Sequence, residues 1–219
     1  MKKYIISIVI LVSTISFSQK IRGFGGFGVY RDVEFKKSGF ASFDGGLEFK
    51  ITNTLKPEIL IEYFVGAIQD RKTYDLNGIE TELLVRTVAA TNISICPKIN
   101  LANYEDHVHL QILPKYNITN VVAKGSLFTL NSSKTELVKT DMNTFSETKH
   151  SIGIGIGVIF DVNDESFQSI ALNLYYNNID IGNAVTKLKF NKGVYHTQQS
   201  FGIGVQYYFG FVKHKNAKL

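Results

Sequence analysis

The sequence predicts an all-β fold: an eight-stranded antiparallel up-and-down transmembrane β-barrel preceded by a cleaved signal peptide. Three observations support this prediction: a strict two-residue alternation in short windows, glycine instead of charge on one face of some windows, and connections of alternating length. In residues 151–160, large apolar residues alternate with a serine and three glycines. Alternate side chains of a strand point to opposite faces. Glycine fits inside a narrow cylinder but gains little from bulk water, so the apolar face is expected to meet lipid.

The N-terminal segment predicts export. Lys2 and Lys3 precede a short apolar stretch, and small residues follow at Ser16 and Ser18. This pattern indicates a signal peptide over residues 1–18 and a barrel domain over residues 19–219. A retained helical anchor is the alternative, although the stretch is shorter than the roughly 20 residues that span a bilayer. Cleavage would remove Lys2 and Lys3 from the 24 basic residues and leave 22 against 19 acidic ones, an excess too small to predict a nucleic-acid partner.

The strands follow in order along the chain. The eight predicted strands cover residues 21–31, 41–51, 57–69, 85–101, 107–119, 149–160, 169–181 and 197–211. The connections 52–56, 102–106 and 161–167 are short, whereas 32–40, 70–84, 120–148 and 182–196 are long and polar. Outer-membrane barrels have short periplasmic turns and long extracellular loops. We therefore expect both termini in the periplasm and an interior just wide enough for side chains to fill.

Strands two to five separate large apolar residues from charged ones, and the polar face is expected to line the barrel interior. The predicted lumen network comprises Asp44, Glu48, Lys50, Glu58, Glu62, Arg86, Lys98, His109 and Lys115. If the first turn is centred near residues 53–54, Lys50 faces Glu58 across the hairpin, where opposite charges stabilise a sheet. The same reasoning couples Glu62 to Arg86 on the next strand.

These features together resemble a known class. The alternation, the loop layout and the junction at residues 16–19 resemble the small OmpA/OmpX-type outer-membrane barrels, and most of all the outer-membrane β-barrel domain proteins of Bacteroidota. The resemblance covers nearly all of residues 19–219 and includes no diagnostic motif. It implies an outer-membrane location and a non-enzymatic structural, binding or scaffolding role in the cell envelope. Such barrels usually end on an aromatic residue; here Phe209 or Phe211 would serve, followed by a basic tail that departs from the pattern.

The long loops predict the partners, namely outer-membrane lipid, lipopolysaccharide and an extracellular or envelope protein. Lys187, Lys189 and Lys192 alternate with apolar residues and would meet lipopolysaccharide phosphates, with a solvated loop edge as the alternative. Residues 120–148 predict either strands that continue beyond the membrane or a loop that recognises an outside partner.

No motif predicts a cofactor or metal. Residues 23–28 match the G-x-G-x-x-G nucleotide fingerprint, but the helix that the fingerprint requires is missing from the pattern. His107 and His109 point the same way along one strand, yet Cys96 is expected too far from them to share a metal ion.

Two other classes of function remain open. An outer-membrane hydrolase or acyltransferase would use serines and histidines near the outer rim, such as His150, Ser151, His196 and Ser200, although their spacing singles out no catalytic set. A secretion-system accessory or a narrow pore is the other alternative.

Overall fold

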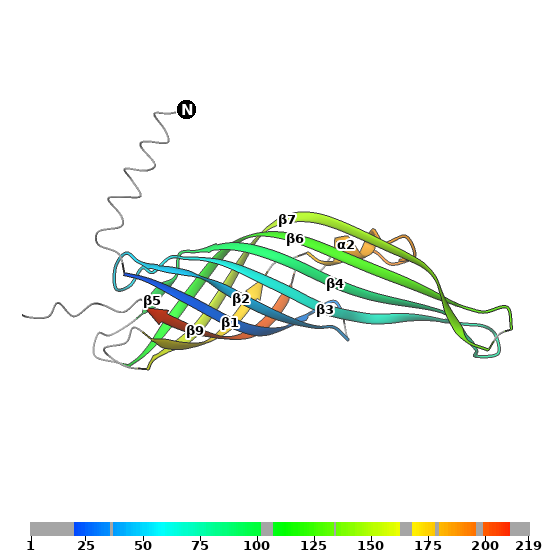
Figure 1. Cartoon of the computed structure of the whole chain (residues 1–219), viewed down its shortest axis with the longest axis horizontal. Coiled ribbons are helices and arrows are strands. Elements are labelled where there is room, and N and C mark those ends of the chain that lie inside the picture. The colour runs from blue at the N-terminus through cyan, green and yellow to red at the C-terminus, as the bar shows by residue number, and fades with distance from the viewer. Residues whose placement is uncertain are drawn as a thin grey trace, which may run out of the picture.

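Eight antiparallel strands close into one ring, seen from the side in Figure 1. The structure is a computed structural model that describes residues 20–35, 37–101, 107–133, 135–162, 168–177, 180–195 and 199–210. The predicted signal peptide, residues 1–18, lies outside the described residues, as do His196 and Phe211. The elements are β1 (Lys20–Asp32), β2 (Gly39–Lys50), β3 (Glu58–Tyr74), β4 (Glu80–Cys96), β5 (Ile99–Leu101), β6 (Val108–Leu130), β7 (Leu137–Asp161), β8 (Ser169–Asn177), the five-residue helix α2 (Gly182–Thr186) and β9 (Ser200–Gly210).

The ring closes through two pairings. Strand β1 pairs with β9, and β4 pairs with β6. The short strand β5 continues the line of β4 after a break at Pro97 and Lys98 and pairs with the same strand, β6. The fourth predicted strand is thus split in two, but the ring still has eight members. The predicted eight-stranded antiparallel up-and-down barrel is confirmed.

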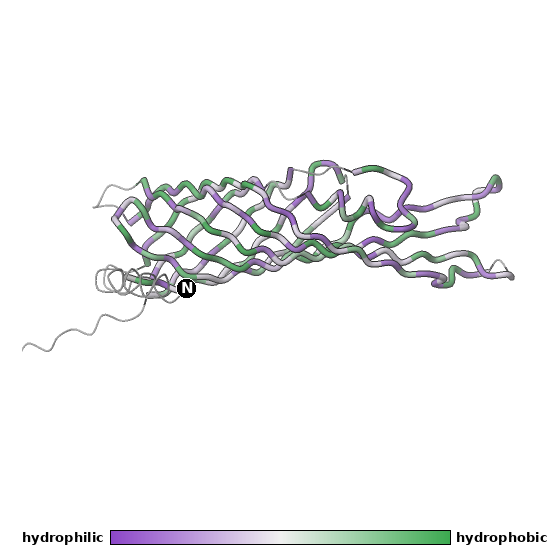
Figure 2. Tube along the Cα trace, turned by 90° about the horizontal axis from the view of Figure 1, so that it is seen from above, coloured by the Kyte–Doolittle hydropathy of each residue, from purple (hydrophilic) through white to green (hydrophobic). Residues whose placement is uncertain are grey.

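Two of the predicted long loops are mostly strand. Strand β3 runs to Tyr74 and β4 starts at Glu80, while β6 runs to Leu130 and β7 starts at Leu137. Because β4 stays paired with β6 as far as Glu82 and Thr129, the two hairpins form one four-stranded sheet beyond the ring. Figures 1 and 2 show this extension leaving one end of the barrel. We call residues 68–86 and 125–143 the projecting sheet.

The strands put apolar side chains outside and polar or small ones inside. In β7, Ile152, Ile154 and Ile156 are 71%, 48% and 56% exposed, and the same face of every other ring strand carries exposed aliphatic or aromatic residues. An apolar surface this large is stable in lipid rather than in water. Among the described residues no helix has the length and hydrophobicity needed to cross a bilayer.

Glycines on the inner face make room for large lumen side chains. A Cβ atom at Gly202 would overlap the ring of Tyr30, and one at Gly155 would lie 2.8 Å from the ring of Tyr175. The inward direction predicted for the glycines of residues 151–160 is therefore correct. Gly155 leaves room for Tyr175, and Gly153 and Gly157 leave room for Asn177 and Asn173.

Candidate functional site

The barrel interior divides into a polar half near the short turns and an apolar half near the projecting sheet. The apolar half contains Tyr30, Phe40, Phe64 and Val88, all at most 8% exposed. The polar half contains buried acids, amides and cations. The interior is therefore charge-lined over only part of its length.

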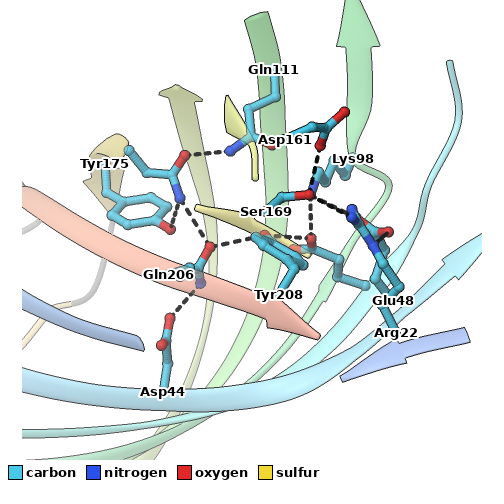
Figure 3. Close-up of polar contacts among 12 residues, drawn as sticks. Arg22, Asp44, Glu48, Lys98, Gln111, Asp161, Ser169, Tyr175, Gln206 and Tyr208 are labelled. Atoms are coloured by element: carbon cyan, nitrogen blue, oxygen red, sulfur yellow. Dashed lines mark hydrogen bonds and ion pairs between the residues drawn. The ribbon is translucent and has the colours of Figure 1, made fainter. Parts of the chain in front are cut away.

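A buried four-residue ion cluster occupies the polar half (Figure 3). Lys98 Nζ lies 2.7 Å from Glu48 Oε2 and 2.8 Å from Glu58 Oε1. Arg22 donates from Nε and Nη2 to the two carboxylate oxygens of Glu48, at 2.7 and 3.0 Å. Glu48 and Glu58 are direct partners across β2 and β3, so two like charges face each other. Lys98 bridges them and removes the repulsion that directly opposed like charges produce in a sheet.

The predicted Lys50–Glu58 pair is wrong. The Ile51 amide donates to the Leu55 carbonyl, which centres the first hairpin on Asn53. The partner of Glu58 is therefore Glu48, two residues from Lys50, and Lys50 lies half-buried opposite Lys20.

A chain of amides and hydroxyls extends from the ion cluster. Tyr208 donates to Glu58 Oε1 at 2.9 Å, and its ring lies under the Lys98 ammonium at 4.0 Å. Gln206 accepts from Asn173 at 2.9 Å and donates to Asp44. Figure 3 shows how these side chains converge from β2, β8 and β9 across the lumen.

At the end of the barrel near the short turns, His109 takes part in a further polar contact. Its Nε2 lies 3.1 Å from Asp161 Oδ2, and Ser169 donates to the other oxygen of Asp161 at 2.7 Å. Arg22 Nη1 donates to Ser169 Oγ at 2.8 Å, which joins this group to the ion cluster.

Glu62 and Lys115 lie where the two halves of the interior meet. Tyr30 donates to Glu62 Oε1 at 2.8 Å. The ammonium of Lys115 lies 4.0 Å from the centre of the Tyr175 ring and has no hydrogen-bond partner among the described residues. This cation–π contact compensates part of the cost of burying the lysine.

The predicted coupling of Glu62 to Arg86 is also wrong. Glu62 lies across from Asn92, whereas Arg86 lies across from Ile68, further along the barrel. Arg86 donates to the Gln69 carbonyl, to Asn191 at 3.2 Å and to the Tyr195 hydroxyl at 3.3 Å. It therefore fixes the last loop and takes no part in the ion cluster.

Residues 181–195, the cap loop, cover the apolar half of the interior. Ala184, Val185 and Leu188 are buried, at most 3% exposed. Asn183 donates to both carboxylate oxygens of Glu147, at 2.9 and 2.7 Å. The predicted extracellular loop thus folds back over the barrel interior.

The three lysines of the cap loop have different surroundings. Lys187 Nζ lies 3.5 Å from Glu147, and Lys189 Nζ lies 3.0 Å from Asp141, both on β7. Lys192 is exposed. Two of the three thus make ion pairs within the protein.

Sequence reasoning missed Arg22, Tyr208, Gln206 and Asn173, which complete the polar network. Gln206 and Tyr208 continue the inward face of Gly202 and Gly204 at the same two-residue spacing. That spacing was a usable signal. Nothing local in the sequence indicated that Arg22 would reach a carboxylate 26 residues away.

The proposed outer-rim serines and histidines do not form a catalytic set among the described residues. His150 Nδ1 contacts the Tyr116 hydroxyl at 2.9 Å on the outer face, and Ser200 donates to the Asn177 carbonyl at 2.9 Å. In the part of the chain that the structure describes, no three His, Cys, Asp or Glu residues are grouped to hold a metal ion.

The comparisons with known proteins give a general likeness of fold. No protein-family model matches the sequence, and no curated protein matches it significantly. Among solved structures, Neisserial surface protein A is 8% identical with a TM-score of 0.45, and covers 88% of this chain and 97% of its own. The attachment invasion locus protein Ail of Yersinia pestis is 11% identical with a TM-score of 0.42, and covers 87% of this chain and 97% of its own. A major outer membrane protein of Thermus thermophilus is 13% identical with a TM-score of 0.44, and covers 88% of this chain and 100% of its own.

At such low identities, and with TM-scores below 0.5, these matches carry no argument about activity. The assignment follows from the chain's own geometry: a closed eight-stranded ring, an apolar exterior and a polar network inside. Only helices and closed barrels satisfy all backbone hydrogen bonds in lipid. The chain is an eight-stranded transmembrane β-barrel of the outer-membrane type.

Proposed function

We propose that this protein is a non-enzymatic outer-membrane barrel that binds an extracellular or envelope protein through its projecting sheet. The observation that carries the proposal is the free edge of β7. Strand β7 pairs with β6 from Leu137 to Phe160, with one irregularity at Thr140, but β8 pairs with it only from Gly153 onward. The edge from Leu137 to Ile152 therefore has no second strand among the described residues.

A free strand edge can take an added strand. Its unpaired backbone groups form hydrogen bonds with any extended segment placed beside it. The cap loop touches side chains of this edge at Asn143 and Glu147, but forms no backbone-to-backbone hydrogen bond with it in the described residues. Strand β7 as a whole is held in place by pairing with 23 residues of β6, so a partner would meet a preformed surface.

The filled interior favours an anchor over a pore. Lys98 and Tyr208 are fully buried in the polar half, and Leu188 of the cap loop is buried in the apolar half. An open channel would leave such side chains in water. No observation in the described residues favours the hydrolase or acyltransferase alternative, and the resemblance to Bacteroidota proteins rests on the sequence alone.

Site-specific photo-crosslinking in intact cells tests the proposal. A crosslinking residue replaces Thr140 on the free part of β7, and a matched one replaces Ile156, where β7 is paired on both sides. We expect a discrete protein adduct at position 140 and none at 156. Absence of an adduct at position 140, or equal adducts at both positions, would contradict the proposal.

A further inference from the structure

The outward face of β4, β6 and β7 changes its chemistry in register. Five rows of cross-strand partners follow one another away from the short turns: Ile95–Tyr116–Ile152, Ile93–Ile118–His150, Thr91–Asn120–Thr148, Ala89–Val122–Ser146 and Thr87–Lys124–Thr144. The first two rows are large and apolar except for His150, and the last three are small and mostly polar. Thr87, Thr91, Asn120, Lys124, Thr144, Ser146 and Thr148 are all exposed, and we call them the hydroxyl band.

The hydroxyl band continues the lipid-facing surface directly. It lies on the same face of the same three strands as the exposed residues Ile93, Ile118 and Ile152. On these three strands the apolar belt therefore ends at the row of His150, and the band occupies the rows that follow it. At about 3.3 Å per residue, its first and last rows are about 13 Å apart along the strands.

The depth of the band argues against a phospholipid surface. With strands tilted by about 35–45°, 13 Å along a strand corresponds to about 10 Å along the membrane normal. The polar region of a phospholipid leaflet is only about 5–8 Å thick. The band is therefore deeper than a phospholipid headgroup layer and suits a thicker polar layer.

The composition of the band points to the chemistry of that layer. Its seven residues supply five hydroxyls, one amide and one ammonium, and no carboxylate. The projecting sheet beyond it differs, because it carries the acids Asp70, Asp75, Glu80, Glu82, Glu136 and Asp141. A surface that merely faces water would not need to exclude acids from one layer. Lys124 in the outermost row adds a positive charge that complements an anion.

We propose that the hydroxyl band binds the phosphorylated saccharide of an outer-leaflet glycolipid. The hydroxyls and the Asn120 amide pair with sugar hydroxyls, and Lys124 pairs with a phosphate group. This inference rests on the proposed outer-membrane location but not on the protein-binding role of the projecting sheet. It moves the glycolipid contact away from Lys187 and Lys189, whose ammonium groups lie against Glu147 and Asp141.

Binding of three probes to the purified full barrel in detergent tests the proposal. The probes are lipopolysaccharide with its core oligosaccharide, lipid A without the core, and phosphatidylglycerol. We expect the wild type to bind the core-containing probe about tenfold more tightly than lipid A, which corresponds to one or two additional hydrogen bonds. The band variant Thr87→Val/Thr91→Val/Thr148→Val should reduce this preference to less than about twofold, and Lys124→Met should weaken binding of the phosphorylated core several-fold at low salt.

A matched control removes hydroxyls outside the band. Ser126→Ala/Ser132→Ala/Ser133→Ala changes exposed or half-buried serines of β6 and the adjoining tip, and should retain the full preference. Retarded gel mobility after boiling, compared with unheated samples, verifies that each variant is folded. Equal binding of lipopolysaccharide and lipid A by the wild type, or an unchanged preference in the band variant, would overturn the proposal. If the wild type binds none of the three lipids, both this proposal and the membrane location are overturned. The crosslinking result at position 140 tests the protein-binding role and does not depend on lipid binding.

Discussion

Lys98→Met should destabilise the barrel strongly, because Lys98 is the cation that separates two opposed buried carboxylates. The ammonium is fully buried and bonds Glu48 at 2.7 Å and Glu58 at 2.8 Å. Glu48 keeps its two bonds from Arg22, but Glu58 keeps only the bond from the Tyr208 hydroxyl. Removing one partner of a buried ion pair costs about 3–5 kcal/mol, since the other charge stays buried without compensation.

A second substitution tests the cause. In Lys98→Met/Glu58→Gln the uncompensated charge is gone, and the remaining pair of Arg22 and Glu48 is intact. The double variant should therefore be more stable than Lys98→Met alone, recovering about 1–3 kcal/mol of the loss. Lys50→Met is the control: Lys50 forms no ion pair with a described residue, and its substitution should change stability by less than about 0.5 kcal/mol.

Urea unfolding in lipid vesicles, followed by circular dichroism, measures all three variants, and the shift of the folded band on an unboiled gel provides a second measurement. Lys98→Met within about 0.5 kcal/mol of the wild type would refute the reasoning. So would a double variant less stable than the single one.

Three further predictions concern the lumen wall, the cap loop and the projecting sheet. Gly202→Ala should cost about 1–3 kcal/mol in the same unfolding assay because the new methyl group overlaps the Tyr30 ring, whereas Gly39→Ala meets nothing within 4 Å and should be neutral. Leu188→Ala should release the cap loop, so that trypsin cuts at Lys187–Lys192 while the ring stays folded; Leu76→Ala, at a fully exposed position, should change neither result. The hydrogen bond from Lys189, together with one from the Met142 amide, lowers the pKa of the Asp141 carboxyl. This contact therefore stabilises the cap loop fully at pH values above the ordinary carboxyl pKa of about 3.9. The stabilisation is lost as the pH falls through the lower pKa of the folded protein. An NMR titration of the Asp141 carboxyl should show a midpoint that rises in Lys189→Met; an unchanged midpoint would mean that the ion pair is absent in solution.

The ring and its two faces could be predicted from sequence because lipid enforces a strong contrast. In β7, Ile154 and Ile156 face outward and Gly155 faces inward, and a two-residue period records that difference directly. Towards the projecting sheet, the two faces of β7 no longer differ in polarity. Phe145 and Glu147 alternate with Thr144, Ser146 and Thr148, so both faces are largely polar and the period is no longer visible. Residues 120–148 were therefore expected either as strands that continue beyond the membrane or as a recognition loop, and residues 70–84 as a loop.

The cap loop escaped prediction for a different reason. Leu188 lies between two lysines, and this arrangement is typical of a loop edge. Its burial depends on the barrel interior next to Gly125, where the Leu188 side chain lies 3.3 Å from the position of a Cβ atom. That space arises only when β6 takes its place in the ring. Contacts of this kind depend on tertiary packing and have no local signature.

The register of the first hairpin explains why the lumen residues were predicted better than their partners. Moving the centre of a turn by one residue moves every cross-strand partner by two, and a shift of two leaves each side chain on its original face. Glu48 and Glu58 thus appear on the lumen face in either register, but in the actual one they oppose each other. That register needs a cation from elsewhere, and Lys98 supplies it from the break between β4 and β5. There Leu55 of the first turn bridges to Ile99, and the Lys56 amide donates to the Lys98 carbonyl at 2.9 Å. The turn that sets two acids against each other also holds the lysine that neutralises them, so the hairpin register and the strand break form one structural unit.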